Sequence, residues 1–109
     1  MPAPPASRPP ARDLVAALWH VVDAYGATLG PYGLALYLVL VRRANAEAQC
    51  SPSYEELATA TRMSRRKVIA TAQALRVLEL VEIRRSRVRG HRNTFILLDP
   101  PGAPGEGAE

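Results

Sequence analysis

Cysteine, lysine, tryptophan and phenylalanine are scarce in this sequence, which has one of each among 109 residues. A single thiol, Cys50, excludes a disulfide framework within the chain and is typical of a protein in a reducing cytoplasm. The apolar run LALYLVLV at 34–41 is far shorter than the roughly 20 residues that a membrane span needs. We therefore expect a cytoplasmic protein with no membrane segment.

Proline is nearly absent from the middle of the chain, because eight of its ten residues lie within 1–10 and 99–109. Both ends also collect Ala, Gly and Ser, and such segments hold too little apolar surface to offset the entropy of an ordered chain. We expect flexible tails at 1–11 and 99–109 around one folded domain at 12–98. A domain of this size is too small for a large enzyme cavity.

Acidic residues are scarce between positions 62 and 92. This segment holds ten basic residues against two acidic ones, a net charge of +8, whereas the rest of the chain has a net charge of −4. A chain divided in this way usually keeps its basic part for a polyanion such as nucleic acid. The alternative is an ordinary solvated surface in an arginine-rich protein, since Arg outnumbers Lys thirteen to one.

Apolar residues recur at helical spacing in the first half of the domain. Steps of four and three predict an amphipathic helix over 12–27. Gly30 and Pro31 separate it from a second helix, expected over 32–47. The second helix is apolar on nearly every side, which predicts that it is buried within one chain or shared with a second subunit.

Two short helices with a tight turn between them follow. Ser53 and Glu56 form the Ser-x-x-Glu pattern of a capping box at the start of a helix over about 54–61. Ser64 is placed to cap another helix only three residues later. The inward face of that helix is expected to consist of Val68, Ala72 and Leu75. This arrangement predicts a helix-turn-helix.

Val81 and Ile83, and then Phe95 and Leu97, recur with a period of two, which predicts two half-buried strands. The basic segment RRSRVRGHR lies between them, so we expect a β-hairpin with a mobile, positively charged tip. The predicted fold is mainly α, with four helices and a small β-hairpin in the order of a winged helix-turn-helix.

The segment PSYEELATATRMSRRKVIATAQALRVLELVEI, with the basic hairpin and NTFILL after it, resembles winged helix-turn-helix DNA-binding domains. It is most similar to those of bacterial, plasmid and phage replication initiators and replisome organisers. The resemblance implies sequence-preferring binding of double-stranded DNA in replication initiation or organisation; a transcriptional repressor with the same binding mode is the alternative. The family often has glycine where Arg62 and Glu79 stand here. If either position is left-handed, its side chain costs about 1 kcal/mol.

Helical geometry places Arg66, Ala70 and Gln73 opposite the apolar face of the expected recognition helix, 64–78. Arg66 is suited to guanine and Gln73 to adenine, while the small Ala70 permits close approach to the base edges. Arg65 and Lys67 flank this face and are expected to clamp the DNA backbone. A solvated helix start is the alternative for these cations, but positive charge there opposes the helix macrodipole.

A basic wing is expected at 84–93, with a charged edge that prevents strand aggregation as its alternative role. The full set of expected DNA-binding residues is Ser53, Arg62, Ser64, Arg65, Arg66, Lys67, Ala70, Gln73, Arg85, Arg87, Arg89, His91 and Arg92.

The sequence shows no phosphate-binding glycine loop, metal cluster or nucleophile–base pair. We therefore expect a nucleoid-associated binding protein without catalytic activity, metal or cofactor. A homodimer that contacts two DNA half-sites is also expected, through Leu14, Leu18, Trp19, Leu36, Tyr37 and Leu40. A winged helix that binds an acidic protein partner is the alternative from another class, and a nuclease fragment is a more distant one.

Overall fold

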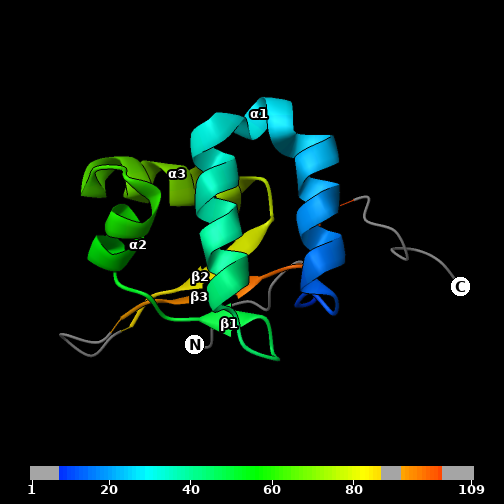
Figure 1. Ribbon diagram of the computed structural model, residues 1–109. Helices are drawn as coiled ribbons and strands as arrows, with labels where there is room; N and C mark the ends of the chain where they lie inside the picture. The colour runs from blue at the N-terminus through cyan, green and yellow to red at the C-terminus, as the bar shows by residue number, and fades with distance from the viewer. Residues whose placement is uncertain (1–7, 87–91, 102–109) are drawn as a thin grey trace, which may run out of the picture.

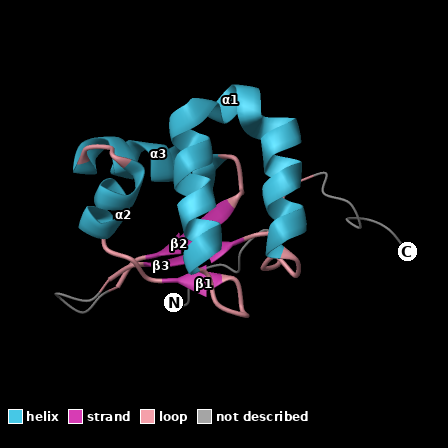
Figure 2. Cartoon of the chain, viewed as in Figure 1, coloured by secondary structure: helices cyan, strands magenta, loops and turns pink. Residues whose placement is uncertain are grey.

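The computed structural model describes residues 8–86 and 92–101. Its elements are α1 (Leu14–Arg43), β1 (Gln49–Cys50), α2 (Tyr54–Thr61), α3 (Arg65–Val77), β2 (Val81–Arg84) and β3 (Thr94–Leu97). The helices lie over one side of a small antiparallel sheet, as Figure 1 and Figure 2 show. The mainly helical architecture with a small sheet agrees with the sequence prediction.

The first helix, α1, is broken in the middle. Gly30 has φ 69° and ψ −176°, a conformation that a side chain would strain, and Pro31 follows it. Figure 1 shows the two arms of α1 standing side by side and joined by this bend. The described residues therefore hold three helices rather than the predicted four, because the two expected N-terminal helices are joined through the bend.

Side chains of Asp13 and Asn45 mark the two ends of α1. Asp13 accepts a hydrogen bond from the N–H of Ala16 at 3.0 Å and caps the start. The helix ends at Arg43 rather than at the expected Glu47, because Oδ1 of Asn45 accepts the N–H groups of both Glu47 and Gln49. Asn side chains commonly replace helical hydrogen bonds with a turn in this way.

The second arm of α1 is buried within the chain itself. Leu36, Tyr37 and Leu40 are all fully buried, so they are unable to contact a second subunit as we had expected. By length and composition alone, α1 is apolar enough to cross a membrane. The break at Gly30 nevertheless divides it into two arms, each shorter than the roughly 20 helical residues that a membrane span needs.

The sheet has the strand order β1-β3-β2, with both pairs antiparallel. In the predicted hairpin, Val81 pairs with Leu97 and Ile83 pairs with Phe95. The additional strand, β1, was not predicted from the sequence. It pairs with β3 through only two residues, which is too short for an alternation of apolar and polar residues to be recognised.

Residues on both sides of the expected 12–98 domain also pair with each other. The N–H of Ala11 donates to the carbonyl of Leu97, and the N–H of Asp99 donates to the carbonyl of Pro9, both at 2.8 Å. Nε of Arg8 donates to the carbonyl of Asp99 at 2.6 Å. The packed part of the chain thus extends past both expected boundaries, because these backbone groups continue the β3 ladder. The remaining tail positions, 1–7 and 102–109, lie outside the described residues.

Candidate nucleic-acid interface

The helix-turn-helix is built on two capped helices. Oγ of Ser53 accepts the N–H of Glu56 at 3.0 Å, and Oε1 of Glu56 accepts the N–H of Ser53 at 2.8 Å, which completes the predicted capping box. Oγ of Ser64 accepts the N–H of Lys67 at 3.0 Å and caps α3. These caps fix where α2 and α3 begin, and therefore which side chains of α3 point outward.

Arg62 and Glu79 both have left-handed backbones, with φ values of 61° and 62°. Arg62 ends α2 in the turn before α3, and Glu79 lies between α3 and β2. These are the two positions at which the related domains often have glycine. Both positions are therefore left-handed here, at the cost of strain in two residues that have side chains.

The outward face of α3 is formed as the helical periodicity predicts. Val68, Ala72 and Leu75 are fully buried, while Arg66 and Ala70 are exposed on the opposite side. Gln73 shares the outward side but is only half-exposed, and its Oε1 accepts a hydrogen bond from Nε of Arg76 at 2.8 Å. A base that pairs with Gln73 must therefore compete with a neighbour on the same helix.

A groove of about 540 Å³ runs between α3 and the bend of α1. Ala70, Gln73 and Val77 line it from α3, and Leu29 and Tyr32 line it from α1. Nζ of Lys67 lies 4.6 Å from the centre of the Tyr32 ring, within the range of a cation–π contact. Lys67 is thus held toward α1 at one end of the outward face.

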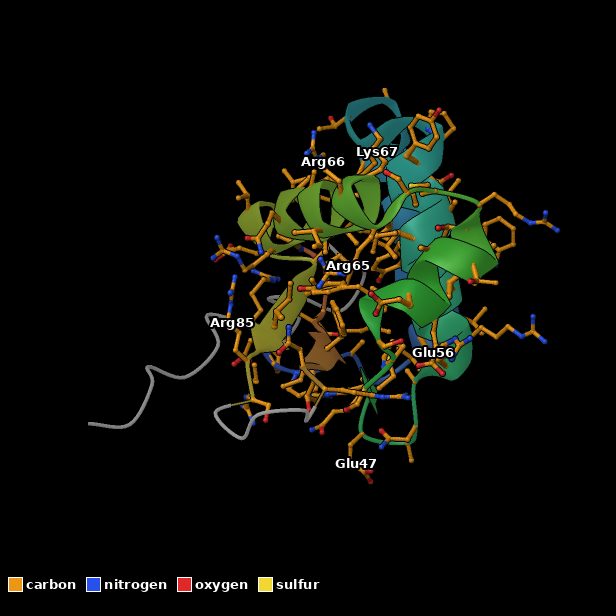
Figure 3. All side chains as sticks on the ribbon, turned by 90° about the vertical axis from the view of Figure 1, so that its left-hand side faces the viewer. Glu47, Glu56, Arg65, Arg66, Lys67 and Arg85 are labelled. Atoms are coloured by element: carbon orange, nitrogen blue, oxygen red, sulfur yellow. The ribbon has the colours of Figure 1, made fainter. Side chains whose placement is uncertain are left out.

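Arg65 lies on a different side of α3 from Arg66. In Figure 3, Arg65 lies between α3 and the strands, whereas Arg66 and Lys67 lie along the far edge of the helix. Nε of Arg65 donates to Oε2 of Glu55 at 2.9 Å. Its guanidinium carbon also lies 5.5 Å from the centre of the Tyr54 ring. The side chain is therefore oriented by two residues of α2.

A second cleft, of about 450 Å³, separates the starts of α2 and α3 from β3 and the segment before it. Arg92 lines this cleft, and its Nη1 lies 2.7 Å from Oε1 of Glu56. The N–H of Ser53 holds the pKa of the Glu56 carboxyl below its usual range, and the charge of Arg92 adds to this effect. Asn93, beside Arg92, donates from Nδ2 to Oη of Tyr54 at 3.3 Å.

The other expected site residues fall into two groups. Arg62 and Arg85 are described and exposed, whereas Arg87, Arg89 and His91 lie outside the described residues. Figure 3 places Arg85 near the hairpin, on the face of the molecule that also carries Arg65. Across 8–86 and 92–101 no group of His, Cys, Asp and Glu side chains is arranged to hold a metal ion.

Sequence reasoning missed three residues that contact the basic side chains of α3, namely Tyr32, Tyr54 and Glu55. The sequence held one signal for these contacts, the acidic pair Glu55 and Glu56 in the first turn of α2. Glu56 was assigned to the helix cap from the sequence, and Glu55 was given no role. The aromatic contacts join segments distant in the sequence, so no local pattern indicates them.

No curated protein and no solved structure matches the chain significantly. A family model described as a helix-turn-helix domain matches residues 27–81, slightly more than half of the chain. The matched range includes the second arm of α1, both capped helices and the left-handed turn at Arg62. The chain therefore belongs to this family of helix-turn-helix domains, a class that binds DNA.

Proposed function

We propose that the domain binds double-stranded DNA with α3 in the major groove and the β2–β3 hairpin on the flanking backbone or minor groove. The strongest support is the outward face of α3, where Arg66 and Ala70 are exposed directly opposite the buried Val68 and Ala72. The major groove is about 12 Å wide and admits an α-helix. A long donor beside a small residue suits such close approach to base edges.

Exposed basic side chains near α3 and in the hairpin also support DNA binding. Arg62, Arg66 and Arg85 are exposed, and within the described ranges none of them forms an ion pair. Their mutual repulsion is relieved when phosphates neutralise them and counterions are released. We propose the same role for Arg87, Arg89 and His91, which lie outside the described residues. Ser53 and Ser64, at the helix starts, are proposed as phosphate contacts.

The salt dependence of duplex binding tests the proposal. Affinity measured by fluorescence anisotropy should fall with a log–log slope of about −0.9 for each phosphate contacted. On a duplex selected from a random pool, Arg66→Ala should cost about 1–3 kcal/mol of binding free energy. Arg12→Ala serves as the matched control, since Arg12 precedes the arm of α1 that lies farthest from α2 in Figure 1. Absence of duplex binding at low salt would refute the proposal.

The process that this binding serves is proposed from the sequence resemblance alone. We propose replication initiation or organisation on the nucleoid in the cytoplasm, by a binding protein without catalytic activity. A transcriptional repressor has the same binding chemistry. The selected DNA distinguishes the two roles, because tandem repeats of one site favour replication whereas a palindrome favours repression.

We also propose a homodimer, through a surface that shares only Trp19 with the one that the sequence predicted. Val15 and Trp19 in the first arm of α1 and Leu38 in the second arm are 62%, 61% and 52% exposed. Val15 and Trp19 are four residues apart and so share one face of the first arm. A contiguous apolar patch on a surface commonly marks a protein contact. Light scattering tests the dimer. Trp19→Lys should leave the domain folded, since Trp19 is mostly exposed, and should yield a monomer; an unchanged mass would exclude this surface.

A further inference from the structure

The guanidinium of Arg65 is held from two directions by α2. Nε donates to Oε2 of Glu55 at 2.9 Å, and the guanidinium carbon lies 5.5 Å from the centre of the Tyr54 ring. No other hydrogen bond of this side chain is found within the described ranges, so both Nη groups are left to bind something else. The Arg65 side chain is 59% exposed, which gives a ligand access to these groups.

A guanidinium is a planar fork whose parallel N–H groups match two acceptors side by side. O6 and N7 of guanine form such a pair on the major-groove edge. A flexible arginine loses side-chain entropy when it binds, whereas a side chain already fixed in its bound orientation loses less. Glu55 and Tyr54 provide this fixation for Arg65, and among the residues that the structure describes no corresponding contact fixes Arg66.

Arg65 also occupies a suitable place in the fold. It is the first residue of α3, and the N-terminal residues of a recognition helix are those that contact base edges. In Figure 3 it lies between α3 and the strands, on the same face as Arg85, whereas Arg66 and Lys67 lie along the far edge of α3. A duplex that contacts both α3 and the hairpin therefore passes Arg65.

We infer that Arg65 is a specificity-determining residue that selects a guanine, and that Glu55 and Tyr54 are its positioning residues. This inference rests on the proposed function and reassigns Arg65, which the sequence placed among the backbone clamps. The phosphate-clamp role requires only a positive charge, whereas the guanine role requires the orientation and the fork of the guanidinium.

Glu55 has a competing role with the opposite consequence. If its carboxylate only masks the charge of Arg65 and repels phosphates, its removal strengthens binding to every duplex. If it positions Arg65, its removal weakens binding to the selected site and has little effect elsewhere. Glu55→Gln removes the charge with almost no change of shape, so the sign of the effect separates the two roles.

The test uses the full chain, the duplex that it enriches from a random pool, and a scrambled duplex of equal length and composition. Glu55→Gln should weaken binding to the enriched duplex on the order of tenfold, with little change on the scrambled one. Arg65→Lys, which keeps the charge but loses the fork, should do the same. When selection is repeated with Arg65→Lys, the preference for guanine at one position should disappear. Glu47→Gln is the charge-matched control, because Glu47 is an exposed loop residue that Figure 3 shows away from Arg65.

Equal strengthening on both duplexes would overturn the inference in favour of charge masking, and an unchanged affinity in both variants would overturn it as well. Thermal unfolding followed by circular dichroism identifies any loss that arises from a destabilised fold. Failure of the unaltered chain to bind any duplex would refute the proposed function itself. A chain that binds and selects a site, but does not respond to either substitution, would refute only the role of Arg65.

Discussion

Nη1 of Arg92 lies 2.7 Å from Oε1 of Glu56, the same oxygen that accepts the N–H of Ser53 at 2.8 Å. One carboxylate thus joins the cap of α2 to the segment that leads into β3. Both contacts favour the ionised form, which is why the pKa of Glu56 is lowered from its usual 4.5. The consequence is a pH-dependent link between the helix-turn-helix and the hairpin.

Glu56→Gln should lower the free energy of unfolding at neutral pH. Because the folded-state pKa of Glu56 lies below its unfolded value of 4.5, its contribution is fully present above that value and is lost as pH falls through the lower, folded-state pKa. Urea unfolding of the unaltered chain and of Glu56→Gln should therefore show that the difference between their free energies of unfolding becomes smaller as the pH falls through this acidic range. Glu47→Gln should show no such trend, and a difference that stays constant into the acid would contradict the explanation.

The left-handed backbone of Arg62 makes a substitution by glycine favourable. Glycine removes strain of about 1–2 kcal/mol, while its greater freedom in the unfolded chain costs about 0.4–1 kcal/mol. Arg62→Gly should therefore raise the free energy of unfolding by roughly 0.5–1 kcal/mol. Arg76→Gly, the same change inside α3, should lower it by a similar amount. If Arg62→Gly and Arg76→Gly change the free energy of unfolding equally, the substitution at Arg62 does not release backbone strain.

Two substitutions of Ser64 separate an effect on the stability of the fold from an effect on DNA binding. Ser64→Ala removes the cap of α3 and should lower the free energy of unfolding by about 1 kcal/mol. Ser64→Asp retains a capping oxygen and should restore most of that loss. Its added negative charge, placed where a phosphate is proposed, should weaken duplex binding on the order of tenfold. Full binding by the Asp variant would place the DNA elsewhere.

Tyr37 and Tyr25 differ in whether the side-chain hydroxyl group is hydrogen-bonded, so the same substitution by Phe should have opposite effects on stability. Tyr37 is fully buried, its Oη has no hydrogen-bond partner among the described residues, and burial raises its pKa well above the usual range. Tyr37→Phe should therefore raise the free energy of unfolding by about 1 kcal/mol. Tyr25 donates to the carbonyl of Pro101 at 3.1 Å, so Tyr25→Phe should lower it by about 0.5–1.5 kcal/mol. If both substitutions lower the free energy of unfolding, the Tyr37 hydroxyl does form a hydrogen bond in the folded protein.

Local signals in the sequence were sufficient for the helix-turn-helix. Ser53 and Ser64 cap the helices that follow them, as predicted, because a capping pattern involves only residues three positions apart. The pairing of β2 with β3 was equally accessible, since Val81 and Ile83, and Phe95 and Leu97, recur with a period of two. Ile96 is buried as well, so β3 is not the half-buried strand that was expected. The end of α1 was not predictable from the pattern of apolar residues. It depends on the hydrogen bonds that the side chain of Asn45 accepts from the backbone after the helix.

The candidate site was predictable in its residue types but not in its pairings. Periodicity identified Arg66 and Ala70 as the outward face of α3. Periodicity gave no sign that Arg65 is oriented by Glu55, ten positions earlier in the chain, or that Gln73 is engaged by Arg76. Such contacts depend on the angle between helices and on side-chain rotamers, which a one-dimensional pattern does not encode.

The contact between Arg8 and Asp99 joins residues that are 91 positions apart. Closing a loop of that size before any other structure exists costs about 4 kcal/mol of chain entropy, so this pairing is expected to form after the helices and the sheet. An interaction that is absent from the folding transition state affects the rate of unfolding alone. Ala11 is buried in the same terminal pairing, where its N–H donates to the carbonyl of Leu97. Ala11→Leu should therefore increase the rate of unfolding and leave the rate of folding unchanged. The pairing of the two ends of the chain would then set the lifetime of the folded domain.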